Sequence, residues 1–566
     1  MTDNRGGTAR QERTLWHGML AAIGIATIGY AVAVAVTGGF AGTVLGIRVS
    51  SRRPVAPLVA GWLLLFYGAS RFDPTRLDAA SAAVVRFVER RGAIIGAGLT
   101  LATFAVALTF GSFVAAGADP YAYVSQATLW AAGNPVQMQD PLALHAPWDR
   151  APASFCPVGY RPGTTDAVIV PVAASGLPLQ MAGPVRAFGP TGGYLIVPIL
   201  GAVVVGLTYR LARQRYSPTV AISAAGLVAL SPVFVYQLML PMTDVPVTAW
   251  WLLAVDAALT PTLGGAAGAG LSSSLAVLTR PNLVPLIAAV AGLMLSTPGA
   301  SRIVRLAVFA ISVVPGIGIA AAANTVFYGG PLRSGYGSFR DLFEIHFAAA
   351  NLRQYADWTW ETHSPLLFAA VVGLPVALVL PSAGLLHDRR FSSFVLAFWV
   401  ATLACYVFYL PFDHWVYLRF LLPAIPLLTI ESVALVWRAC RRLSALPRAF
   451  TCAAIVSAAA LTCIRTTAGT GTLSLEQLFR DRYVESANRV GAETPPASAV
   501  VCLLQSGSLR TYASRLTIRY DLIDPAQFPA VVDYLTRRGR TPFVALETTE
   551  LEDFRQRFAG TNVVPT

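Results

Sequence analysis

Lysine is absent from this chain of 566 residues, so all 42 of its basic residues are arginine. Charge of either sign is scarce, because charged residues make up 13% of the chain against about 25% in soluble globular domains. Hydrophobic residues make up 55%, and the mean hydropathy is +0.58. This composition excludes an ordinary soluble enzyme and indicates an α-helical membrane protein that crosses the bilayer many times.

Cysteine is also rare. The six cysteines form no Cys-x-x-Cys pair and show no spacing typical of metal ligands, so the sequence predicts neither a disulfide framework nor a zinc site. The opening residues 1–13 are short and polar, and the first apolar run lacks a cleavage-site pattern. We therefore expect a retained signal anchor.

Long apolar runs are plentiful. A run of roughly 17 to 25 apolar residues is long enough to cross a bilayer, and we predict about thirteen transmembrane helices, several of them short. The expected spans are residues 15–37, 55–70, 93–115, 194–211, 218–236, 245–259, 265–279, 283–295, 303–324, 365–385, 393–410, 417–437 and 450–464.

Arginine placement predicts the orientation. With a cytoplasmic N-terminus, the clusters at 71–91, 210–215, 302–305, 389–390 and 438–448 fall on the cytoplasmic side, as the positive-inside rule requires. The exception is the loop 38–53, whose alternating pattern predicts a surface hairpin. Two long loops, 116–193 and 325–364, and the C-terminal tail are then outside. We expect any chemistry to face outward, away from cytosolic nucleotide sugars and ATP.

Three parts are predicted: an N-terminal transmembrane pair with its loops (1–92), a transmembrane core (93–466), and a small soluble α/β domain outside the membrane (467–566). In the last part, residues 499–504, 516–520 and 542–546 are expected strands, and 525–537 and 550–558 expected helices. This part has no phosphate loop, nucleophile elbow or metal cluster. We expect it to bind the acceptor or to be structural.

Ionisable residues at the outer ends of the expected spans are the candidate site. Asp119 opens the first long outer loop, and Asp244, Arg280 and Arg419 lie at other outer helix ends, with His414 close to the last of these. Carboxylates and arginines at the membrane surface suit a phosphate carried on a lipid. Two alternatives stay open: the two aspartates cap helices, and the two arginines extend to lipid headgroups.

Motifs around these residues resemble a known family. Asp119, Tyr123, Ala127 and the run Gly133-Asn134-Pro135 resemble the first outer loop of the polytopic glycosyltransferases of the C superfamily, particularly the bacterial branch similar to dolichyl-phosphate-mannose and aminoarabinose transferases. Further matches follow in order: Gly176-Leu177-Pro178-Leu179, Met242-Thr243-Asp244-Val245-Pro246, Leu278-Thr279-Arg280-Pro281, Tyr328-Gly329-Gly330-Pro331 and Ser334-Gly335-Tyr336-Gly337. The matches cover residues 119–423.

This resemblance implies transfer of a sugar from a polyprenyl-phosphate donor to a glycan, lipid or protein acceptor. It implies Asp119 as the catalytic base, with inversion at the sugar carbon. Arg280 and Arg419 would stabilise the leaving phosphate, with Arg333 and Arg340 as alternatives. The substrate-binding residues would be Tyr123, Asp140, Asp244, Arg280, Arg333, Tyr336, His414 and Arg419.

A divalent metal is possible at such a site, and Asp140, His145, Asp149 and His346 are ligand types on the outer side. Their spacing matches no known cage, so no metal site is predicted, and no nucleic-acid partner is expected. The alternative function is a transporter or flippase of lipid-linked sugars. Transporters tend to show internal repeats and midplane charges, and this sequence shows neither.

The predicted location is a bacterial inner membrane, with the N-terminus cytoplasmic and the C-terminal part outside. Alkaline phosphatase fused after Thr566 should therefore be active, because this reporter folds only outside the cytoplasm. An inactive phosphatase there, together with a fluorescent cytosolic reporter fused at the same point, would contradict the orientation and the outward-facing site.

Overall fold

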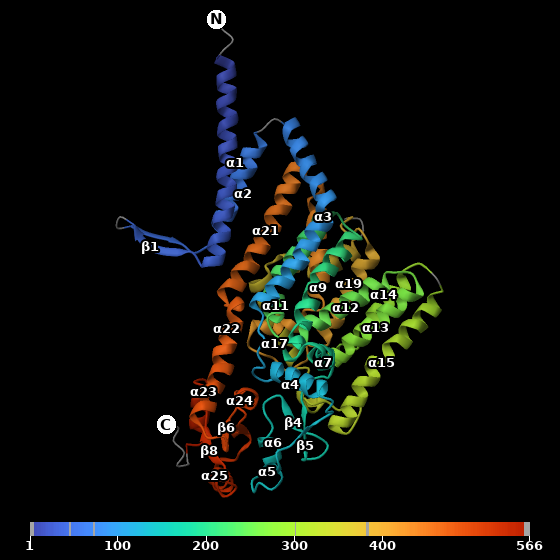
Figure 1. The fold of residues 1–566 in the computed structure, drawn as a ribbon. Helices are drawn as coiled ribbons and strands as arrows, with labels where there is room; N and C mark the ends of the chain where they lie inside the picture. Colours follow the sequence, from blue (N-terminus) through green and yellow to red (C-terminus); the bar gives the residue numbers. More distant parts are fainter. Residues whose placement is uncertain (1–4, 45–46, 72–73, 300, 381–383, 560–566) are drawn as a thin grey trace.

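A computed structural model describes residues 5–44, 47–71, 74–299, 301–380 and 384–559. The molecule is elongated and mostly helical, with α1 (Arg5–Thr37) at one end and the strands of the C-terminal region at the other (Figure 1). Between them lies a bundle of apolar helices that contains the largest buried core. The mostly helical fold agrees with the composition.

Most of each apolar run predicted to span the membrane is helical among the described residues. The helices are α1, α2 (Val55–Ser70), α3 (Pro74–Phe110), α9 (Ile196–Arg213), α10 (Pro218–Leu230), α11 (Pro232–Leu238), α12 (Asp244–Ala258), α13 (Leu263–Thr279), α14 (Leu286–Ser296), α15 (Arg302–Tyr328), α18 (Leu366–Val379), α19 (Arg389–Ala404), η3 (Trp415–Leu421), α20 (Ile425–Ala439) and α21 (Ala445–Gly469). Single-turn helices η1 (Pro281–Leu283), η4 (Cys440–Arg442) and η5 (Thr472–Ser474) follow three of them.

Fewer of these helices are long enough to cross a membrane alone. Among the described residues five qualify by length and composition, or seven if two bent pairs each count as one span. The pair α10–α11 bends by 58° at Ser231-Pro232, and the pair formed by η3 and α20 bends by 88°. Proline lacks the N–H that would continue the helical hydrogen bonds, which accounts for the first bend. The count of thirteen spans stays a prediction.

The N-terminal part contains the predicted hairpin. Strands β1 (Phe40–Val44) and β2 (Ile47–Ser51) pair antiparallel, and the expected alternation is confirmed. The helices on either side, α1 and α2, pack closely through Gly24 and Gly61, where an added Cβ would lie within 2.8 Å of the opposite helix. Helix α3 is continuous, so the predicted boundary at residue 92 falls inside it. The apolar run that begins there continues a more polar helical stretch.

The two long outer loops fold into short elements. The first contains α4 (Asp119–Ala131), α5 (Pro141–Leu144), α6 (Ala151–Ser154), α7 (Gly176–Phe188), α8 (Pro190–Tyr194) and the antiparallel sheet β3-β5-β4. Its strands are Gln137–Met138, Val168–Pro171 and Tyr160–Pro162. The second contains α16 (Phe339–Leu342) and α17 (Phe347–His363).

The C-terminal region holds a parallel sheet ordered β7-β6-β8 (Leu516–Arg519, Ser498–Cys502, Thr541–Val544). The chain reaches it through α22 (Leu475–Phe479), the π-helical turn η6 (Arg480–Glu485) and α23 (Ser486–Glu493). Around the sheet lie α24 (Ser506–Tyr512), η7 (Tyr520–Leu522), η8 (Pro525–Gln527), α25 (Phe528–Arg537) and α26 (Leu551–Arg557). The expected strands and helices are present here.

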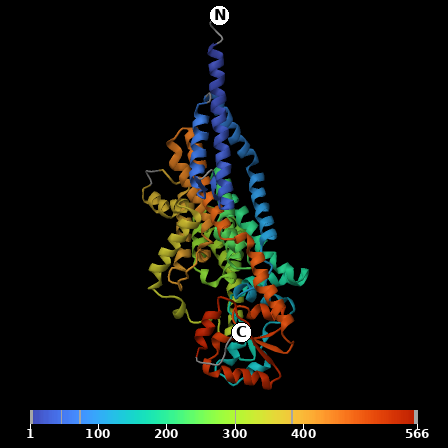
Figure 2. The ribbon, with the colours of Figure 1, turned by 90° about the vertical axis from the view of Figure 1, so that its left-hand side faces the viewer.

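The C-terminal region packs against the first outer loop, so residues from two of the predicted parts share a core. Trp148 and Phe155 of the first outer loop share a buried core with Val531 and Leu535 of α25. The two regions lie side by side in both views (Figures 1 and 2). The Tyr534 hydroxyl also donates to the carbonyl of Leu142 at 2.8 Å. Sequence patterns report local structure, so they did not reveal that two distant segments share one core.

Phe155→Ala should test this shared core. The Phe155 side chain is fully buried, so its removal should lower the free energy of unfolding by about 3–5 kcal/mol. The expected result is a lower thermal midpoint for the detergent-solubilised protein and faster tryptic cleavage of the C-terminal region. Phe188→Ala is the matched control because Phe188 is 75% exposed. Equal effects of the two substitutions would contradict a shared core.

Candidate functional site

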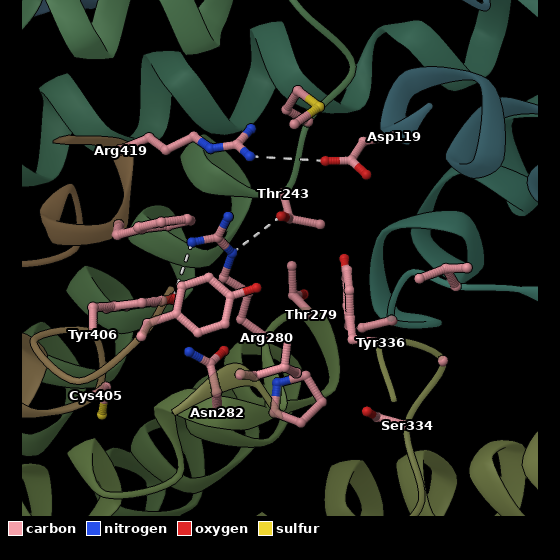
Figure 3. A pocket seen from close by; sticks show the side chains of 18 of the residues that line it. Asp119, Thr243, Thr279, Arg280, Asn282, Ser334, Tyr336, Cys405, Tyr406 and Arg419 are labelled. Atoms are coloured by element: carbon pink, nitrogen blue, oxygen red, sulfur yellow. Dashed lines mark hydrogen bonds and ion pairs between the residues drawn. The ribbon is translucent and has the colours of Figure 1, made fainter. Parts of the chain in front are cut away.

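A cavity of about 1400 Å³ lies where the outer ends of the apolar helices meet the outer loops. Its wall is formed by the start of α4, the ends of α13 and α19, the loop after α15, helix η3, and the segment from α22 to η6. Four of the side chains predicted from sequence, Asp119, Arg280, Tyr336 and Arg419, line it (Figure 3). These elements come from distant parts of the chain.

Asp119 lies in the first turn of α4, and its side chain is 33% exposed toward the cavity. One carboxylate oxygen is 3.8 Å from Nη2 of Arg419, and the two side chains point toward one another (Figure 3). Within the described residues, no side chain caps α4. The geometry therefore favours a partly hydrated carboxylate facing the cavity over a helix cap.

Asp244 lies behind the arginines and is fully buried. Its oxygens are 2.8 Å from Nη2 of Arg280 and 3.9 Å from Nη1 of Arg419. These contacts are ion pairs whose geometry does not meet hydrogen-bond criteria. The N-cap position of α12 is occupied by Thr243 and not by Asp244. A buried carboxylate needs a compensating charge, and here one carboxylate is shared by two guanidinium groups.

The two arginines are held inside the protein, which argues against the alternative that they extend to lipid headgroups. Their side chains are 13% and 15% exposed. Arg280 donates through Nε to Oγ1 of Thr243 at 3.2 Å and through Nη1 to the hydroxyl of Tyr406 at 3.1 Å (Figure 3). Nε of Arg419 is buried and has no hydrogen-bond partner among the residues that the structure describes. Arg419 is therefore held by its ion pairs with Asp119 and Asp244 and by its ring contacts.

Close packing of α7 on α13 sets the position of Arg280. A Cβ on Gly176 would lie 2.4 Å from the backbone of Leu278 and Thr279, so only glycine allows this approach. Gln180, one turn further along α7, donates to the Thr279 hydroxyl at 3.0 Å. Arg280 follows as the extended C-cap residue of α13. Two of the motifs behind the family resemblance thus meet in space.

An aromatic wall adjoins the arginines. Tyr406 stacks on Phe420 with ring centroids 4.7 Å apart, and the Arg280 guanidinium lies 5.5 Å from the Phe420 ring centre. Arg419 lies 5.1 Å from the Tyr417 ring centre. Such rings attract cations and exclude water, so the guanidinium charges interact more strongly with a ligand than they would in solvent.

Tyr123, Arg333 and Tyr336 also line the cavity. Burial raises the pKa of the Tyr123 phenol well above its ordinary value, so it stays a neutral hydroxyl beside Asp119. Tyr336 reaches the site because Gly335 lets its loop approach Val172, where an added Cβ would lie 2.3 Å from the carbonyl oxygen. The structure thus brings together Asp119, Tyr123, Asp244, Arg280, Arg333, Tyr336 and Arg419.

Other candidates from the sequence do not line this cavity. Asp140 caps α5, since its carboxylate accepts the Leu142 N–H at 2.9 Å. His414 is exposed at the start of η3 and accepts the Val416 N–H. Arg340 is exposed between two cavity-lining parts of its loop, and His145 and Asp149 are exposed in the first outer loop. The sequence placed these residues on the outer side but could not resolve their direction.

His346 pairs with Glu344, a cavity residue that the sequence did not single out, at 2.8 Å. Thr243 was quoted only as part of a motif. Tyr406 and Phe420 were missed because an aromatic residue in an apolar run carries no distinctive signal, and Phe479 and Tyr483 because their polar segment was assigned to a separate C-terminal part. Within the described ranges, no group of three or more His, Cys, Asp or Glu could hold a metal ion.

Asp244→Asn should test the buried ion cluster. Asparagine keeps the size and any capping role of aspartate but leaves two buried guanidinium groups without their shared carboxylate. Losing one partner of a buried ion pair costs about 3–5 kcal/mol, so the thermal midpoint in detergent should fall. The control is Asp256→Asn, because Arg210, the partner of Asp256, is 61% exposed and such pairs contribute about 1 kcal/mol or less. Equal midpoints for the two variants would contradict the cluster.

Three comparisons relate the chain to known proteins. Residues 184–324 match the family described as dolichyl-phosphate-mannose-protein mannosyltransferase. The structure is similar to a crystal structure of ArnT from Cupriavidus metallidurans bound to undecaprenyl phosphate, with a TM-score of 0.51 and 12% identity, over 83% of this chain and 94% of that one. The curated proteins gave no match.

Weaker structural similarity extends to the oligosaccharyltransferase AglB from Archaeoglobus fulgidus, in complex with an inhibitory peptide and a dolichol-phosphate. The TM-score is 0.49 at 13% identity, over 81% of this chain and 70% of that one. The family match and the fold shared with ArnT confirm the resemblance to the polytopic glycosyltransferases of the C superfamily that the sequence motifs indicated.

Proposed function

We propose that the chain is a membrane glycosyltransferase that moves a sugar from a polyprenyl phosphate to an acceptor hydroxyl or amine at the outer face of the membrane. The observation that carries the proposal is one cavity lined by a partly exposed carboxylate, Asp119, and by Arg419, a largely buried arginine 3.8 Å from it. The description of the matched family names a dolichyl-phosphate sugar. The ArnT structure contains bound undecaprenyl phosphate. Both support a lipid-linked donor.

Charge around the cavity suits a phosphate. Asp244 neutralises about one of the two guanidinium charges it faces, and Arg333 adds a further cation on the cavity wall. Arginine donors match phosphate oxygens in pairs. As the bond between the sugar C1 and the phosphate oxygen breaks, the electron pair goes to that oxygen, and the arginines stabilise the resulting anion without protonating it.

The shape of the cavity also suits a lipid donor. Val284 and Pro285 after α13, Ile317 and Ala320 of α15, and Phe408 after α19 give the cavity an apolar lining alongside the polar site. The apolar residues come from the membrane helices or their ends, so a prenyl chain could enter from the bilayer while its phosphate reaches Arg280 and Arg419. This division favours an amphiphilic donor over a nucleotide sugar.

Asp119 would act as the general base. The acceptor oxygen or nitrogen attacks C1 on the face opposite the phosphate, and its proton passes to the Asp119 carboxylate. Attack opposite the leaving group gives inversion at C1. The neutral Tyr123 hydroxyl lies one turn along α4 and can orient the acceptor or the carboxylate.

Asp119→Asn should lower the transfer rate by roughly 10²-fold or more, the usual contribution of general base catalysis. Asparagine keeps the size of the side chain, so insertion and folding should be unchanged. The measurement is transfer from polyprenyl-phosphate sugars by the purified protein in reconstituted vesicles. Asp413→Asn, which neutralises an exposed aspartate outside the cavity lining, should retain full activity.

Two results would redirect the proposal. Near-normal transfer by Asp119→Asn would exclude Asp119 as the base and make Glu344, another carboxylate that lines the cavity, the candidate. No transfer from any polyprenyl-phosphate sugar by the wild-type protein, with movement of such lipids across the vesicle membrane, would support a transporter of lipid-linked sugars.

A further inference from the structure

The segment between α3 and α4, residues 111–118, has no regular secondary structure and leads directly to Asp119, the first residue of α4. Two of its backbone donors bond to the C-terminal region, more than 350 residues later in the chain. The Phe113 N–H donates to Oε2 of Glu476 at 3.0 Å, and the Ala115 N–H donates to the hydroxyl of Tyr512 at 3.0 Å. Glu476 is in α22 and Tyr512 ends α24.

Side-chain packing supports the same connection. Tyr483 of the π-helical turn η6 packs against Val114 and Ala116 in a small buried cluster. Gly117, two residues before Asp119, has φ +61°, and a Cβ there would lie 3.5 Å from the Tyr483 hydroxyl. Single π-helical turns are frequent at functional sites. Residues 114–117 therefore lie against a surface supplied by the C-terminal region.

Helix α24 also contacts α4 directly. Gly507 faces the ring of Tyr121. A Cβ added to Gly507 would lie 2.5 Å from a ring carbon. Helix α4, which begins with Asp119, is thus contacted directly by α24. The segment that precedes α4 is contacted by the C-terminal region as well. The other backbone connection of this segment, from the Ser112 N–H to the Met239 carbonyl at 2.6 Å, comes from the membrane core.

We propose that Glu476 and Tyr512 are positioning residues for Asp119, and that the C-terminal region is a working part of the active site. Without these two acceptors, the buried N–H groups of residues 113 and 115 would lose their partners, and the segment would relax toward other arrangements. A carboxylate must stay within hydrogen-bond reach of the proton it removes, and a shift of about 1 Å can cost roughly 10²-fold in rate. The catalytic part of this inference rests on the proposed function.

Hydrogen–deuterium exchange tests the structural part without any reaction. In Tyr512→Phe and Glu476→Ala, amides in a peptide covering residues 111–120 should exchange at least roughly tenfold faster than in the wild type, because their acceptors are gone. Tyr534→Phe is the matched control: it removes the same group from the same region, but its hydroxyl bonds to Leu142 instead. Unchanged exchange in both variants would overturn the inference, whatever the protein catalyses.

Kinetics test the catalytic part. Tyr512→Phe should lower kcat roughly 10-fold with the donor KM unchanged, and Glu476→Gln, which keeps an accepting oxygen, should restore the rate lost in Glu476→Ala. In the Asp119→Asn background, Tyr512→Phe should cause no further loss, since there is no base left to position. A full additional loss there, or a drop in abundance without a change in kcat, would make Tyr512 a stabilising residue only.

Wild-type transfer separates this inference from the proposed function. If the wild-type protein transfers sugar and Asp119→Asn does not, but Tyr512→Phe is fully active, the positioning role alone is wrong. If the wild-type protein transfers nothing while exchange at residues 111–120 rises as expected, the C-terminal region holds this segment and the proposed function is wrong.

Discussion

The site depends on a buried carboxylate that two arginines share. Asp244 has no exposed surface, and Arg280 and Arg419 are nearly as enclosed. A buried ion pair is weak evidence of stability, because removing the charges from water offsets much of their attraction. Here the ion cluster orients the arginines, because the Asp244 carboxylate keeps two guanidinium groups at the wall of the same cavity. One carboxylate balances only part of their combined charge. An anionic ligand would complete the set, and the lipid phosphate of the proposed function is such a ligand.

The membrane explains why the site lies where it does. Inside a bilayer every backbone polar group needs a partner within the protein, so the apolar part of the chain is restricted to helices. Irregular backbone can find hydrogen-bond partners only at the outer ends of the helices, where the loops fold over them. The extended C-cap at Arg280, the short helix η3 that contains Arg419 and the turn before Asp119 all belong to this layer. Three interruptions of regular helix therefore provide charged groups of a single cavity.

Local patterns predicted much of this architecture. Apolar runs located the helices, alternation located β1 and β2, and acidic or basic residues at helix ends located Asp119, Asp244, Arg280 and Arg419. What sequence could not supply was direction and long-range contact. Asp140 and Asp119 both precede prolines in the same outer loop, yet one caps a short helix and the other faces the cavity. The aromatic wall was missed for the same reason, because burial in a site and burial in a core select the same residue types.

The contact between the first outer loop and the C-terminal region is the clearest case of non-local order. Neither segment is long enough to bury Trp148 or Phe155 alone, and their shared core arises only when the last strand-forming residues meet a loop formed hundreds of residues earlier. This arrangement makes the geometry around Asp119 depend on completion of the whole chain. A ligand that binds the C-terminal region would act on the base through Glu476 and Tyr512, over two hydrogen bonds rather than through the membrane helices. In the proposed reaction, Asp119 and the arginines thus have separate physical supports: hydrogen bonds to the C-terminal region hold the segment before Asp119, and Asp244 holds the two arginines.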